Sequence, residues 1–228
     1  MKPIRAWYFS DETRKLRYGD GRTIAIGIEH TVSGYPDLGQ NGLHGAEQII
    51  EALNYAPGPV VWLVELSGRI KRADDKLAAT RRKYIAGGID ISDILRRFAR
   101  AEALLVADKW DCPEVMRRWL ETGDESIRSA ALLSVEAGTD SNAESYARSA
   151  ARSTARSTAL SAALSTASSA AWSAAWVFTL SPALPPASSS VRSPALSPAW
   201  SAAQSSAWLY AWSNANKMLE TMVMEVIK

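Results

Sequence analysis

The stretch SYARSAARSTARSTAL (residues 145–160) opens a tandem repeat with a period of four residues. Between residues 145 and 216 the chain divides into 18 consecutive units, of which 15 begin with serine and 16 carry alanine in third place. Alanine is the best helix former, and residues four apart lie on neighbouring turns of a helix. The repeat therefore predicts that the C-terminal part of the chain, residues 141–228, is helical.

Five prolines interrupt this repeat within 17 residues, from Pro182 to Pro198. A proline inside a helix costs roughly 3 kcal/mol, which disfavours one straight helix through all five. We expect a helical hairpin, with a long helix over residues 142–178, a Pro-rich connector at residues 179–197, and a second helix that continues to the C-terminus. The alternative, suggested by the unbroken register, is that all 18 units form the coils of a solenoid.

The fourth place of the repeat unit carries the side chains suited to a partner. Four residues of an α-helix turn through about 400°, so the fourth-place side chains shift by about 40° around the helix with each unit. No single partner surface can therefore cover all of them. Uncovered tryptophans at this density would form a large apolar patch, so either the hairpin packs on the front of the chain or further copies surround it. Three arginines spaced by four form a ladder that could bind phosphates or carboxylates, or could only keep the helix soluble. The candidate binding residues of the repeat are Arg148, Arg152, Arg156, Trp172, Trp176, Trp208 and Trp212.

The front of the chain has the composition of a globular domain. Runs of β-branched and aromatic residues predict strands at residues 4–9, 60–66 and 76–85. The sequence Gly19-Asp20-Gly21 predicts a hairpin turn, because Asp-Gly favours the backbone of tight turns. Residues 46–55 carry apolar side chains at helical spacing and predict a helix.

Helical spacing takes over from residue 91, where Phe98, Leu105 and Val106 belong to one apolar series. We therefore expect an α+β protein. Its parts would be a small mixed β-sheet domain at residues 1–90, a helical region at residues 91–140, and the repeat hairpin at residues 141–228.

Composition limits the functions that the chain can perform. The net charge is +2 over 228 residues, which excludes a nucleic-acid binder that acts through bulk charge. The single cysteine, Cys112, excludes a disulfide framework, and two histidines are too few for a histidine-rich metal site. We expect no metal, no cofactor, no membrane span and no nucleic-acid partner. The cationic run Arg81-Arg82-Lys83 could contact phosphates, but the near-neutral total charge favours an exposed helix face.

Polar residues of the front part form the best candidate for a binding or catalytic site. A hairpin tip, a helix start and a strand carry them, and a compact fold could bring them together. The candidates are Arg17, Asp20, Arg22, His44, Glu47 and Glu65. The alternative interpretation is structural, with Asp20 as a turn residue, His44 as a packed side chain and Glu65 facing solvent.

Several motifs resemble an uncharacterised domain family of phage and prophage genomes. These motifs are RYGDGR (residues 17–22), NGLH (41–44), ALNYAPGP (52–59), VELSG (64–68) and ETGDESIR (121–128). Members of that family are also similar in running on into Ala-rich repeats of four residues, although this chain prefers Ser and adds the Pro-rich units. The resemblance implies a phage-encoded protein in the cytoplasm of a bacterial host, and it brings no established activity.

A second resemblance involves Gly42-Leu43-His44-Gly45, followed by Ala52 and Tyr55. This segment is similar in outline to the strand and helix that line the nicotinamide pocket of ADP-ribosyltransferases. It implies an enzyme, or a binder of a nucleotide-like metabolite, that uses Arg22, His44 and Glu65. Gly45-Ala46 stands where that family places Ser or Thr, and the chain has no clear Glu-x-Glu motif.

Our leading hypothesis is therefore a non-enzymatic phage accessory protein. It would bind other proteins or assemble with itself into a homo-oligomer through the repeat. The enzyme is the alternative hypothesis.

Overall fold

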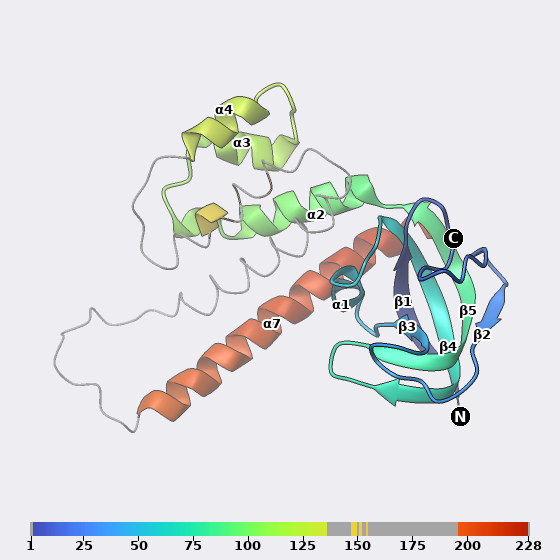
Figure 1. Cartoon of the computed structure of the whole chain (residues 1–228). Coiled ribbons are helices and arrows are strands. Elements are labelled where there is room, and N and C mark those ends of the chain that lie inside the picture. The colour runs from blue at the N-terminus through green and yellow to red at the C-terminus, as the bar shows by residue number, and fades with distance from the viewer. Residues whose placement is uncertain (1, 136–146, 150, 152–153, 155–195, 228) are drawn as a thin grey trace. The chain divides into compact units, whose positions relative to one another are not determined.

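The computed structural model describes residues 2–135, 147–149, 151, 154 and 196–227 of the chain (Figure 1). The described residues 2–95, which we call the β domain, form one compact unit together with residues 218–227. The described residues between 96 and 154, with residues 196–217, form a second unit, which we call the helical unit. The connector predicted at residues 179–197 and the first arm of the hairpin lie almost entirely outside the described residues.

The β domain is built around a long central hairpin. Its elements are β1 (Ile4–Ser10), β2 (Glu29–Thr31), β3 (Leu43–Gly45), α1 (Ile49–Leu53), β4 (Val60–Arg72) and β5 (Leu77–Asp90). The turn between β4 and β5 is closed by the Ala73 N–H, which donates to the Lys76 carbonyl at 2.9 Å. β1 pairs with β4, and both β2 and β3 pair with β5.

The expectation of a mixed sheet is wrong, because every pairing among the described strands is antiparallel. A tight turn joins β4 to β5, and such a turn can link only antiparallel neighbours. The other three strands each run opposite to the hairpin strand beside them. The antiparallel sheet with helices after it confirms the α+β class.

A bridge between Trp7 and Ala46 closes the sheet into a small barrel. The Trp7 N–H donates to the Ala46 carbonyl at 2.7 Å, and the Ala46 N–H donates to the Trp7 carbonyl at 3.0 Å. Because Ala46 follows β3, the strands β1, β4, β5 and β3 succeed one another around the barrel (Figure 1). Gly45 permits the closure, since a Cβ there would lie 3.2 Å from the Cβ of Ala6. The bridge also explains why the helix predicted over residues 46–55 is only α1.

The interior of the barrel is filled by alternate strand residues. Ala6, Val64 and Tyr84 belong to one buried cluster, together with Leu16 and Ile24 from the segment before β2. This segment was expected to form a regular hairpin around Gly19-Asp20-Gly21. The structure has an isolated antiparallel bridge between Lys15 and Thr23 instead. Between these two residues the Leu16 N–H donates to the Arg22 carbonyl.

Helices follow the sheet. They are α2 (Ser92–Leu105), a short 3₁₀ helix (Ala107–Lys109), α3 (Glu114–Thr122), α4 (Arg128–Ser134) and α7 (Leu196–Met224). The core of the helical unit includes Trp110, Met116 and Trp119, together with Ala147 and Ala151. Both alanines hold the third place of their repeat units, which indicates that this small residue packs closely.

The last helix, α7, begins at Leu196, and Pro198 lies in its first turn, where proline is tolerated. Buried residues recur every three or four positions along its second half: Trp212, Ala215, Leu219 and Val223. No helix among the described residues is long and apolar enough to cross a bilayer.

Candidate functional site

The β domain buries a charged side chain, Arg82, which is 2% exposed. β5 places Arg82 opposite His30 of β2 and Leu66 of β4. The Nε and Nη2 atoms of Arg82 donate to the Tyr84 hydroxyl at 3.0 and 2.7 Å, and Nη1 donates to the His44 carbonyl at 2.6 Å. A buried charge is costly unless hydrogen bonds replace water, and these three bonds supply that replacement.

Aromatic rings complete the surroundings of Arg82. The guanidinium carbon lies 3.7 Å from the centroid of the Tyr8 ring and 5.2 Å from that of Tyr84. Ring faces attract cations, and the attraction grows when water is excluded. Among the described residues no carboxylate forms an ion pair with Arg82. Oxygen atoms and π faces therefore hold this charge.

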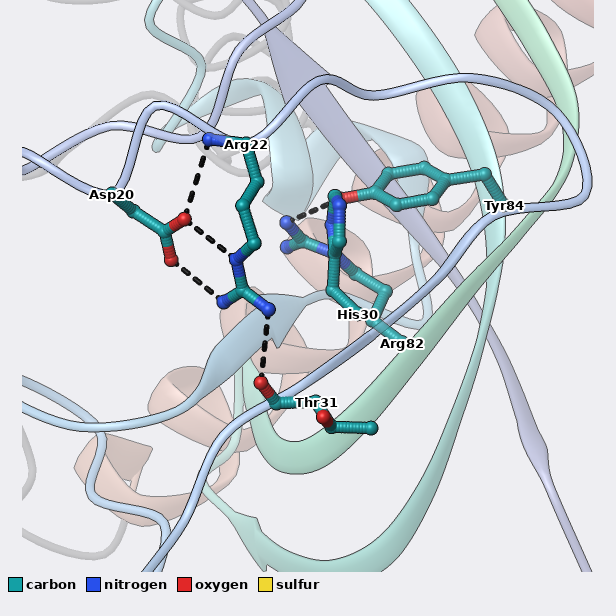
Figure 2. Close-up of polar contacts among 6 residues, drawn as sticks. All are labelled: Asp20, Arg22, His30, Thr31, Arg82 and Tyr84. Atoms are coloured by element: carbon teal, nitrogen blue, oxygen red, sulfur yellow. Dashed lines mark hydrogen bonds and ion pairs between the residues drawn. The ribbon is translucent and has the colours of Figure 1, made fainter.

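His30 joins the same cluster (Figure 2). It is buried, and its Nδ1 lies 3.2 Å from the Tyr84 hydroxyl oxygen. Burial lowers the pKa of His30, and the positive charges of Arg22 and Arg82 lower it further. Burial raises the pKa of Tyr84 to about 12. Because arginine can only donate, the Tyr84 oxygen accepts from Arg82, and its proton is free to bond the neutral imidazole of His30.

Asp20 and Arg22 form the outer layer of this cluster. Arg22 binds the Asp20 carboxylate through two parallel bonds, from Nε at 2.6 Å and from Nη2 at 2.7 Å. Its Nη1 donates to the Thr31 carbonyl at 3.0 Å, so Arg22 ties the 14–22 turn to β2 (Figure 2). The hydrogen bonds from Arg22 lower the pKa of Asp20.

The other predicted site residues of the β domain have separate partners. His44 contributes its carbonyl to Arg82, but its Nε2 lies 3.2 Å from the Asp37 carbonyl, and burial lowers its pKa. Glu47 forms an ion pair with Arg72. Glu65 pairs in register with Arg5 on one side and Lys83 on the other, in a row of alternating charges across the sheet. The guanidinium of Arg17 lies 5.3 Å from the Tyr18 ring.

The structure therefore joins Asp20 and Arg22 and places the His44 backbone nearby. It gives the side chains of Arg22, His44 and Glu65, proposed together for an ADP-ribosyltransferase-like site, three different sets of neighbours. Among the described residues no group of three or more His, Cys, Asp or Glu side chains is arranged to hold a metal ion.

Few of the repeat's candidate residues fall within the described part of the chain. The guanidinium of Arg148 lies 5.1 Å from the Trp110 ring, and Trp212 is buried in α7. Trp208 lies on α7. Arg152, Arg156, Trp172 and Trp176 lie outside the described residues.

Sequence reasoning did not identify Arg82, Tyr84, His30 and Tyr8 as members of a cluster. Arg82 was assigned with Arg81 and Lys83 to an exposed helix face, and this is wrong. The three residues lie on a strand, where side chains alternate between faces, so the middle cation points inward while its neighbours are exposed. The strand predicted at residues 76–85 contains all three cations, and its alternation could have given this signal.

A second buried charge lies in the helical unit. Glu102, on α2, is 3% exposed, and its Oε1 accepts no hydrogen bond from the described residues. Burial raises the pKa of its carboxyl to about 7. The half-buried Cys112 has a thiol whose pKa burial raises to about 11, so it is not activated as a nucleophile.

Comparison with known proteins adds one finding. Residues 13–97 match a family described as a domain of unknown function (DUF7666). No curated protein and no solved structure matches the chain significantly. The matched segment contains Asp20, Arg22, His30, Arg82 and Tyr84, so the buried cluster, apart from Tyr8, lies within the region that is similar to this uncharacterised domain family.

Proposed function

We propose that the chain is a non-enzymatic binding protein that assembles with further copies of itself through its repeat. In this proposal the β domain recognises a host or phage component, and the protein acts in the cytoplasm of a bacterial host. The phage context is supported by the motif resemblance alone. The observation that carries the proposal of self-assembly is that α7 has apolar side chains on two sides.

One side of α7 is the buried stripe that contains Trp212 and Ala215. On the other side Tyr210 is 72% exposed, and Leu209, about 60° from Trp212 at the edge of the buried stripe, is 61% exposed. At 100° per residue, Tyr210 lies about 160° around the helix from Trp212. One packing surface therefore does not cover both sets of apolar side chains.

A second copy of the same helix is the partner that suits this exposed side. A helix of 29 residues is about 44 Å long, which provides a long surface for helix packing. Third-place alanines let helices approach closely: Ala147, Ala151 and Ala215 are buried, and Ala211 is half-buried. The repeat gives every copy the same spacing, so the surfaces of two copies match in register.

The β domain suits a scaffold for recognition. Its buried polar cluster is satisfied internally, with Arg82 bonded to Tyr84 and to the His44 carbonyl. Such a cluster fixes the barrel and the loops that it carries. Recognition would then depend on side chains displayed on those loops.

The mass of the full chain in solution tests self-assembly, measured by light scattering after gel filtration. We expect a multimer of the 24.7 kDa chain. Replacing Leu209 and Tyr210 with Gln removes the exposed apolar pair and keeps helix propensity, and it should shift the mass toward that of one chain. The matched control replaces Ser213 and Asn214, which are exposed one turn later, with Gln.

The control should keep the mass of the unaltered protein. A monomeric unaltered chain would contradict the proposal. So would a double variant at Leu209 and Tyr210 that assembles as well as the unaltered chain.

A further inference from the structure

We propose that the turn formed by residues 14–22, which we call the Tyr18 tip, binds single-stranded nucleic acid. Tyr18 would stack on a base, and Arg14, Lys15 and Arg17 would contact the phosphates. This inference rests on the recognition role proposed for the β domain, but it does not depend on self-assembly through α7.

The Tyr18 tip displays its aromatic residue at a cost in backbone energy. Tyr18 is 96% exposed, and its φ of 59° lies in the left-handed region that favours glycine. Arg14 has a φ of 52°. A bulky side chain in this conformation is uncommon, and such residues cluster at binding sites. Since the Tyr18 ring buries almost nothing, folding alone gives no reason for a tyrosine here.

The tip is nevertheless held firmly. The Leu16 N–H donates to the Arg22 carbonyl at 2.9 Å, and the Ile24 N–H donates to the Arg14 carbonyl at 2.8 Å. Leu16 and Ile24 are both buried in the barrel cluster. Arg22 adds its two bonds to Asp20 and one to the Thr31 carbonyl. A tip fixed in this way loses little entropy when it binds.

The charge on the tip is positive. Arg14, Lys15 and Arg17 are exposed, and none of them forms an ion pair among the described residues. The carboxylate within the tip, Asp20, is occupied by Arg22. Just before the tip Asp11 accepts hydrogen bonds from Thr13, and Glu12 is exposed. Three cations without an ion pair among the described residues therefore lie in the same turn as Tyr18 and suit a partner with negative charge.

The same pairing of cation and ring recurs on the β domain. Tyr35 is 78% exposed, and the guanidinium of Arg69 lies 4.4 Å from its centroid. Lys76 lies 4.5 Å from the ring of Tyr55, which is also exposed. The three most exposed tyrosines of the described β domain thus each have a cation near the ring.

The backbone of the sheet fixes the position of Arg69. Gly68, with a φ of +80°, lies at an irregularity of β4, where a Cβ would lie 2.2 Å from Thr80 Oγ1. The Arg69 N–H donates to that same hydroxyl at 3.0 Å. The backbone at this point therefore requires glycine, and it sets Arg69 beside Tyr35.

Aromatic rings beside free cations are the arrangement that proteins use to bind single strands. Bases stack on rings and guanidinium planes, while cations follow the phosphates. An acidic protein would need the cations but not exposed rings paired with them, so the pairing favours a nucleic acid. The net charge of +2 argues only against binding through bulk charge, and the Tyr18 tip is a local concentration of charge.

The test is fluorescence anisotropy of a labelled 20-nucleotide oligothymidylate titrated with the full chain. Stacking on one base is worth roughly a 5- to 150-fold change in affinity, so Tyr18→Ala should weaken binding within that range. Tyr18→Trp keeps a stacking ring and should retain binding. Changing Arg14, Lys15 and Arg17 together to Gln should reduce the slope of log affinity against log salt by about 2.

Two controls accompany this test. Leu133→Ala removes an exposed apolar side chain of α4, outside both the Tyr18 tip and α7, and should leave oligothymidylate binding unchanged. Tyr18→Ala should leave the mass in solution unchanged. If Tyr18→Ala were to disturb folding, Tyr18→Gly provides the same loss of the ring with a residue that suits a φ of 59°.

Three results would overturn the inference. One is the lack of saturable binding to oligothymidylate. Another is binding that neither Tyr18→Ala nor Tyr18→Gly weakens. The third is equal binding of labelled polyglutamate, which would identify an acidic protein surface as the ligand.

Discussion

The β domain and the helical unit each bury one charged side chain, and they treat it in opposite ways. Arg82 in the β domain has three hydrogen bonds and two ring faces around its guanidinium. Glu102 in the helical unit has a carboxyl oxygen without a hydrogen bond from the described residues. Both side chains are almost completely buried.

The difference follows from the chemistry of the two groups. Arginine stays protonated at any pH at which the protein is folded, so the fold must replace its water with oxygen atoms and π faces. A glutamate can take up a proton and become neutral, so it can be buried without a partner at a cost that depends on pH. Buried charges in the two units should therefore respond differently to substitution.

The largest expected effect is that of Arg82→Ala in the β domain. The substitution leaves a cavity and strips the Tyr84 hydroxyl and the His44 carbonyl of buried donors, which should cost about 3 to 4 kcal/mol of unfolding free energy. Denaturant unfolding measures the loss. Arg81→Ala, on the exposed neighbouring residue, is the matched control and should stay within about 0.5 kcal/mol. Similar losses in both variants would mean that the local strand, and not the buried cluster, determines the effect.

The same two arginines indicate how far sequence reasoning extends. Strands were predicted at residues 4–9, 60–66 and 76–85, and the structure has β1, β4 and β5 there. The inward direction of Arg82 was missed because the run of three cations was assigned to an exposed helix face, although the strand predicted at residues 76–85 contains it. Its partner His30 is 52 residues away in sequence, and the Trp7–Ala46 bridge that closes the barrel leaves no local sequence signal.

For α2, too, the sequence predicted the element but not which of its side chains are buried. The predicted apolar series included Leu105, which is exposed, whereas the buried positions after Phe98 include Glu102 and Val106. Helical spacing predicted the element correctly. Which side of the helix is buried was decided by packing, which placed an acid inside and a leucine outside. Asp20 and Arg22, two residues apart, were predicted as neighbours because a local turn was enough to join them.

Glu102→Gln should give the next largest effect, and its sign depends on pH. The pKa of Glu102 is raised to about 7 in the fold, so the neutral form is favoured there. The unfolded chain loses this proton near pH 4.5, and hence stability falls as the pH rises from about 4.5 to about 7 and is constant above that range. The lost free energy is about 3 kcal/mol.

Glutamine matches the protonated acid in shape and does not titrate. The variant should therefore equal the unaltered chain at pH 4 and exceed its stability by about 3 kcal/mol at pH 8. Unfolding in denaturant across this range measures the difference. Glu121→Gln, at an exposed position of α3, should show a difference below about 0.5 kcal/mol at every pH. Equal pH profiles for the Glu102 variant and the unaltered chain would show that Glu102 is solvated in solution.

The smallest effect separates the two means by which the β domain holds Arg82. Tyr84→Phe keeps the ring, which meets Trp62 edge-on at 5.4 Å, and removes only the hydroxyl. Arg82 loses two of its three bonds, and His30 loses its contact with the hydroxyl. We expect a loss of about 2 kcal/mol in denaturant unfolding, since hydrogen bonds to charged groups are worth about 1.5 to 3 kcal/mol. Tyr8→Phe is the control, because the Tyr8 ring covers the guanidinium at 3.7 Å and its hydroxyl bonds no described residue. If the Tyr84 variant is as stable as this control, the ring faces alone hold the charge. The contrast with Glu102, whose Oε1 accepts no hydrogen bond from the described residues, would then rest on cation–π attraction instead of hydrogen bonding.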